Sequence, residues 1–144
     1  MRLPRSVAGW TIAVFGLLAF TLGLFGLIRP DDLLGLLGFQ VVEARGPGDY
    51  TKVYMAASSM AAVNMGVYYM LAAASDWTPF FRWTVPFRLV TFVVFTTLVV
   101  TGAAPAEFFG VGLWEGLGAL VTGLALWREG RLVQSSSARR PATR

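Results

Sequence analysis

The chain has 144 residues, of which 56% are hydrophobic and only 14% charged, whereas soluble domains carry about 25% charged residues. The apolar residues fall in four blocks, each close to the ~20 residues needed to cross the hydrocarbon core of a bilayer. Four such segments use most of the chain, so the sequence predicts one membrane domain and no soluble catalytic module. The absence of cysteine and histidine excludes disulfides, thiol nucleophiles and the commonest metal ligand.

The first predicted span covers residues 7–28 and follows two basic residues, Arg2 and Arg5. A cleaved signal peptide is the alternative, but the apolar run exceeds the 7–15 residues typical of a signal core, so we expect a retained anchor. Three glycines recur every seven residues in this segment: Gly9, Gly16 and Gly23. Such a stripe lets a second helix approach closely, because packing drives helix association in lipid.

A short helix is predicted at residues 30–39, lying in the membrane interface rather than crossing the membrane. Pro30 suits the first position of a helix, and Asp31 and Asp32 suit the positive end of its dipole. The leucines that follow are too few to span a bilayer. Residues 40–49, which contain Gly-Pro-Gly, form the loop that leads to the next segment.

The second predicted span covers residues 50–74. Its polar and small residues recur at spacings of three or four, which places them on one helix face: Tyr50, Tyr54, Ala57, Ala61, Asn64 and Tyr68. Asn64 lies near the middle of the span. We expect its amide either to form an interhelical hydrogen bond, worth about 0.6 kcal/mol on average, or to line a ligand cavity together with Tyr68.

The second half of the chain predicts a helical hairpin. A turn at residues 75–86 leads to a third span at about residues 84–102, and a tight turn leads to a fourth at residues 108–127. The last segment, residues 128–144, is polar and basic and has no apolar face to bury, so we expect a disordered tail.

The charge distribution predicts that both ends of the chain are cytoplasmic, because short basic segments remain on that side of the membrane. With four spans, the inner segments hold most of the arginines: Arg2, Arg5, Arg82, Arg128, Arg131, Arg139, Arg140 and Arg144. Four of the five tryptophans fall at the same interface, where indole rings concentrate: Trp10, Trp77, Trp83 and Trp127. We therefore expect a multi-pass protein of a bacterial inner membrane.

Each of the last two predicted spans holds one charged residue, and a charge at the centre of a membrane helix costs about 2.5–3.5 kcal/mol. Counted from the turn at Pro105, Arg88 and Glu115 differ in depth by seven residues, or about 10 Å at ~1.5 Å per residue. Three interpretations remain open: a structural role in which Glu115 pairs with Arg88 or with Asn64, a polar site for the head of a lipid-like ligand formed with Asn64 and Tyr68, and a proton or ion path. In each of them we expect Glu115 to face protein rather than lipid.

Other chemical motifs are missing from the sequence. It contains no phosphate-binding glycine loop, no metal-ligand cluster and no serine nucleophile elbow, so we predict no cofactor and no metal. Attraction to anionic lipids explains the basic tail without a nucleic-acid partner.

A set of residues spread over the spans resembles the small four-helix membrane proteins of bacteria in the DoxX-like and DUF4345-like group: Pro30, Gly38, Tyr54, Gly66, Arg88 and Glu115. The resemblance covers residues 7–127 and implies four antiparallel helices. Some members of that group are described as accessory subunits of redox or stress systems.

The sequence thus predicts an all-α, four-helix antiparallel transmembrane bundle with a short interfacial helix. The expected function is that of a non-enzymatic accessory or scaffold subunit, which packs with itself or with a larger membrane complex through glycine-rich helix faces. The alternative is a protein, and conceivably an enzyme, that binds a lipid, sterol or quinone at Arg88, Glu115 and Asn64.

Overall fold

Helices make up nearly all of the structure, a computed structural model that describes residues 3–138 and the side chains as far as residue 130. No strand occurs in that part of the chain, so the predicted all-α class is confirmed. The elements in chain order are α1 (Val7–Ile28), α2 (Pro30–Leu36), α3 (Thr51–Ala74), α4 (Thr78–Val100), the 3-10 helix η1 (Ala106–Phe108) and α5 (Phe109–Ala138).

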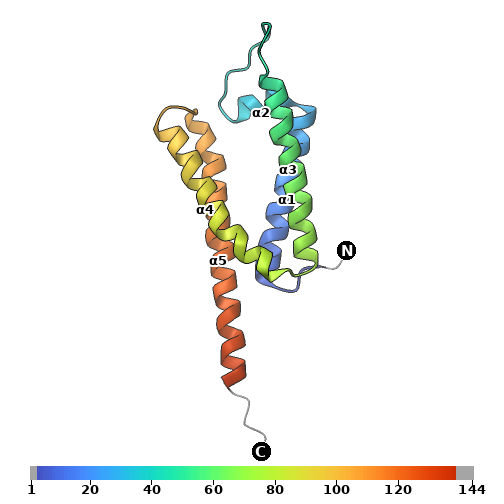
Figure 1. Ribbon diagram of the computed structural model, residues 1–144, viewed down its shortest axis with the longest axis vertical. Coiled ribbons are helices and arrows are strands. Elements are labelled where there is room, and N and C mark those ends of the chain that lie inside the picture. Colours follow the sequence, from blue (N-terminus) through green and yellow to red (C-terminus); the bar gives the residue numbers. More distant parts are fainter. Residues whose placement is uncertain (1–2, 139–144) are drawn as a thin grey trace, which may run out of the picture.

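The four long helices form two antiparallel hairpins, α1 with α3 and α4 with α5 (Figure 1). Helix α1 is the central element, because it also packs against α5, α4 and α2. The hairpins diverge toward the end at which α2 lies, and the loop after α2 bridges them there (Figure 1). In that bridge the ring of Phe39 lies 5.6 Å from that of Phe108. The arrangement is therefore a pair of joined hairpins, more open than the predicted bundle.

Glycines allow the backbones of α1 and α3 to approach closely. A Cβ atom added at Gly66 would lie 2.6 Å from the carbonyl oxygen of Gly16 and 2.6 Å from the amide nitrogen of Phe20. One added at Gly23 would lie 2.6 Å from the carbonyl oxygen of Ser59. Gly16 and Gly23 of the glycine stripe thus pack against a helix of the same chain, whereas Gly9 lies beside Asp76.

Helix α1 begins where two distant acidic side chains meet its N-terminus. Ser6 caps the helix by accepting a hydrogen bond from the amide of Gly9, and its hydroxyl donates to Asp76 at 3.0 Å. The amide of Ala8 donates to Glu129 on α5 at 3.1 Å. Carboxylates are favourable at this end of a helix, because unpaired N–H groups and the helix dipole make it positive.

Helix α4 begins at Thr78, so most of the turn predicted at residues 75–86 is helical and that boundary is wrong. Pro79 occupies the first turn of the helix, where a missing N–H group costs nothing. The side chain of Phe81 is fully buried and holds this turn against the core. Pro86 lies inside the helix, which continues through it.

Helix α5 continues to Ala138, beyond the expected end of the fourth span at residue 127. The first part of the segment predicted as a disordered tail is therefore helical. No proline interrupts the sequence before residue 141, and backbone hydrogen bonds within a helix need no tertiary partner. Residues 139–144 of that predicted tail lie outside the described residues.

Three helical segments within the described residues are long and apolar enough to cross a membrane: Val7–Ile28, Thr78–Val100 and Ala106–Gly130. Helix α3 has 24 residues, about 36 Å at ~1.5 Å per residue, but it is more polar than the other three. The structure thus indicates a membrane protein with at least three segments suited to a bilayer.

Candidate functional site

The two ionisable side chains predicted inside the spans form an ion pair. The Nε atom of Arg88 on α4 donates to Oε2 of Glu115 on α5 at 2.8 Å. The Arg88 side chain is only 4% exposed and that of Glu115 is 23% exposed. The seven-residue difference in depth is thus spanned by direct contact, and the charge on Glu115 faces protein as expected.

The guanidinium of Arg88 is the point at which all four long helices meet. Its Cζ atom lies 3.6 Å above the ring of Phe15 on α1, within the range of a cation–π contact. On α3, the ring of Tyr69 lies 5.8 Å from the same atom. The ring of Phe15 in turn lies 4.2 Å from that of Trp114 on α5. One cation therefore holds an anion from its own hairpin and aromatic rings from the other.

Gly118 provides the space for this cation on α5. A Cβ atom added at Gly118 would lie 2.6 Å from Nη1 of Arg88 and would also overlap the ring of Phe15. Ala119 and Thr122, on the same helix, are buried beside it. Gly118 and these two neighbours thus line the interior, and they leave room for the guanidinium between α5 and the ring of Phe15.

The other two predicted site residues do not join the pair. Asn64 and Tyr68 are exposed on α3, and among the described residues no hydrogen bond to the Asn64 amide forms. Among the described residues Asn64 therefore makes neither the expected interhelical hydrogen bond nor a cavity wall with Arg88. Tyr69 takes the inward position instead. Sequence reasoning missed Tyr69 and Phe15, and the only available signal was that a buried arginine is often covered by aromatic rings.

The chemistry of the pair is that of two charges that neutralise each other. The Nη1 atom of Arg88 is buried without a hydrogen-bond partner among the described residues. The ring of Tyr69 also lies beside Arg88, and no group of three metal-binding side chains occurs in that part of the chain. Two surface grooves in the structure lie away from the pair, one beside Trp77 and one beside Arg128.

Polar contacts continue along the hairpin junction from Arg88 toward the N-terminus of α1. The hydroxyl groups of Thr11 and Thr122 lie 2.9 Å apart, and Thr122 is fully buried. Two helical turns further along α5, Glu129 accepts the hydrogen bond from Ala8. The two hairpins are therefore joined at three depths, by the contact of Arg88 with Phe15 and by these two hydrogen bonds.

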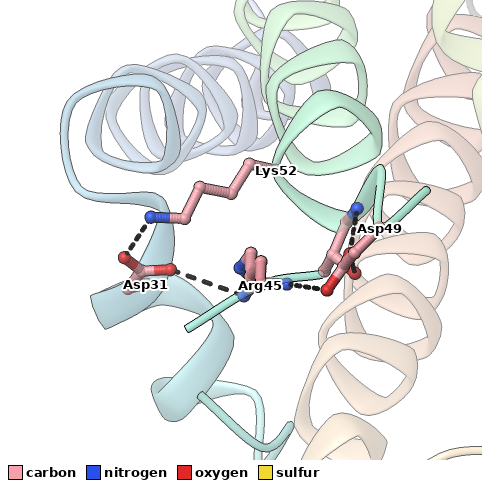
Figure 2. Close-up of polar contacts among 5 residues, drawn as sticks. Asp31, Arg45, Asp49 and Lys52 are labelled. Carbon is pink, nitrogen blue, oxygen red and sulfur yellow. Dashed lines mark hydrogen bonds and ion pairs between the residues drawn. The ribbon is translucent and has the colours of Figure 1, made fainter. Parts of the chain in front are cut away.

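A second group of charges fastens the loop between α2 and α3. Figure 2 shows Asp31 between Lys52 and Arg45, at 2.7 Å and 3.7 Å, and Arg45 in contact with Asp49 at 3.0 Å. The hydrogen bond from Lys52 holds the pKa of the Asp31 carboxyl below its ordinary value. Hydrogen bonds from Thr51 lower the pKa of Asp49 in the same way. These carboxylates are ionised at neutral pH and fix the path of the loop.

Comparison of the chain with protein-family models, curated proteins and solved structures finds no match. The resemblance to the DoxX-like and DUF4345-like group therefore stays a prediction from the sequence.

Proposed function

We propose that the chain is a four-span protein of a bacterial inner membrane with both ends in the cytoplasm. Helix α3 is the span that this proposal adds to the three apolar segments, and its packing against α1 supports its place in the membrane. The glycine contacts at Gly16 and Gly23 hold it against α1, which is apolar enough to cross the membrane. A helix packed along a membrane span lies at the same depth. The exposed arginines Arg5, Arg82 and Arg128 belong to the same end of the helices, as the positive-inside rule requires.

Within that membrane the chain acts as a non-enzymatic accessory or scaffold subunit. The observation that carries this proposal is the use of the Arg88 charge: it is neutralised by Glu115 and covered by Phe15, so it holds four helices together. We infer that the buried ion pair favours one arrangement of the four helices over others, which is a role proposed for buried charges in proteins. The contacts of Arg88 and Glu115 are those of a structural ion pair.

The surface through which the subunit binds a partner is the exposed face of α3. The glycines of α1 are occupied by α3, so the glycine-rich faces predicted for partner binding are largely used within the chain. The face of α3 that points away from α1 carries small and polar residues: Tyr54, Ala57, Ala61, Asn64 and Tyr68. Small residues and hydrogen-bonding amides are typical of contacts between membrane helices. The partner is a second copy of the chain or a helix of a larger complex.

A second candidate function is binding of a lipid, sterol or quinone at the ion pair. The observation in its favour is that Nη1 of Arg88 lacks a partner among the described residues while Glu115 is partly exposed. A carbonyl or hydroxyl oxygen of a ligand would satisfy that donor. Asn64 and Tyr68 do not contribute to this version of the site, because they lie on the outer face of α3.

Native mass spectrometry from a gentle detergent tests both functions in one spectrum. We expect the full chain to appear as an oligomer or with a co-purified subunit, and Asn64→Leu to reduce that assembly about threefold, because an interhelical hydrogen bond in lipid contributes about 0.6 kcal/mol on average. Thr97→Leu removes an exposed hydroxyl from α4 and leaves the exposed face of α3 intact, so it is the matched control. If the protein is strictly monomeric and carries one sterol or quinone per chain, the accessory role is wrong and the ligand-binding function is supported.

A further inference from the structure

A shallow groove runs between the start of α1 and the last part of α5. Its wall is formed by apolar side chains, and its rim carries one residue of each charge; the lining residues are Val7, Val121, Leu124, Ala125, Arg128 and Glu129. Its volume is about 360 Å³, within the range of small-molecule sites. The groove lies at the end of the helices that carries Arg5 and Arg82, which is the proposed cytoplasmic end.

The two charges at the rim are not equivalent. The carboxylate of Glu129 accepts the hydrogen bond from the amide of Ala8 and therefore faces the positive end of α1. Asp76, the other acidic residue near this end, is likewise engaged by the backbone of Arg5 and the hydroxyl of Ser6. The guanidinium of Arg128 is exposed and forms no ion pair with any described side chain. The groove thus presents an apolar wall and, at its end, a cation that forms no ion pair with a described carboxylate.

We propose that this groove binds an anionic phospholipid of the cytoplasmic leaflet. One acyl chain lies along Val121 and Leu124, and the phosphate pairs with Arg128. The apolar wall matches a hydrocarbon chain, and the cation at the cytoplasmic end matches a headgroup with net negative charge. A zwitterionic headgroup gains less, because its own cation offsets the phosphate. The inference rests on the proposed membrane embedding and orientation, but not on the accessory role.

The test uses the full chain, purified in gentle detergent, stripped of lipid and mixed with dioleoylphosphatidylglycerol or dioleoylphosphatidylcholine. Native mass spectrometry counts the lipid molecules retained. We expect the wild type to retain phosphatidylglycerol in preference to phosphatidylcholine. Arg128→Gln should weaken that preference about fivefold, the effect of one arginine near an anionic surface. Val121→Trp, at an exposed position in the wall, should reduce retention of phosphatidylglycerol although Arg128 is still present.

The matched control is Arg82→Gln, which removes an exposed arginine from the same end of the molecule but outside the groove. It should leave the preference unchanged. If Arg82→Gln and Arg128→Gln lost the preference for phosphatidylglycerol equally, the lipid would be attracted to the whole basic surface, and the proposed binding site in the groove would be wrong. A wild type without any preference would also contradict the proposal. The same spectra also report the oligomeric state. A protein that assembles normally but shows no lipid preference would contradict the lipid site and leave the proposed accessory role standing.

Discussion

Glu115→Ala is expected to lower the free energy of unfolding by about 3–5 kcal/mol, because it leaves the buried guanidinium of Arg88 without an anion. The remaining cation is 4% exposed and lies between Phe15 and Gly118, and no other described carboxylate is within ion-pair distance to take the place of Glu115. Thermal unfolding in a gentle detergent, followed by circular dichroism, measures the loss.

Two further variants separate the ion pair from a general effect of charge. Arg88→Met/Glu115→Leu should recover most of the lost stability, because apolar side chains of similar volume often replace a buried pair at little cost. Glu43→Ala removes an exposed carboxylate from the loop and should leave the unfolding temperature unchanged. A Glu115→Ala protein as stable as the wild type would show that the pair does not hold the helices together.

Gly66→Val is expected to separate α1 from α3 and to lower stability by more than about 3 kcal/mol, beyond the usual range for overpacking. The reason is that the new Cβ atom would meet the backbone of Gly16 and Phe20 at 2.6 Å, and backbone atoms cannot move aside as a flexible side chain does. The same unfolding experiment measures the effect.

Gly110→Val is the matched control for this substitution. Nothing lies within 4 Å of a Cβ atom added at Gly110, so the change should stay within about 0.5 kcal/mol. If both valine variants unfolded alike, helix propensity rather than the close approach of two backbones would explain the effect, and the packing described for α1 and α3 would be wrong.

Much of the fold could be predicted, because helix limits depend on local chemistry. The first helix occupies the expected residues, and Pro30 with two aspartates begins a short helix as expected. Glu115 is predicted to face protein, because an ionisable side chain inside a membrane segment rarely faces lipid, and its pairing with Arg88 is one of the three interpretations that the sequence leaves open. In each case the residue type has a low free energy in only one kind of environment.

The environment of the site could not be predicted in the same way. Both faces of a membrane helix are apolar, so periodicity in α3 did not distinguish the face with Asn64 from the face with Gly66 and Tyr69. The partner of the glycine stripe, the ring over Arg88 and the start of α4 depend on contacts between distant segments. Pro86 was read as the end of a turn, although α4 accommodates it inside the helix.

The most direct test of the account is the side of the membrane on which each end of the chain lies. Helix α3 decides the result, because three spans place the ends on opposite sides and four spans place them together. Reporter fusions at the two termini, one active only in the cytoplasm and one only outside it, measure this in cells. If the chain has four spans, both termini show activity of the cytoplasmic reporter. Activity on opposite sides of the membrane would contradict the four-span topology, because α3 would then lie outside the membrane.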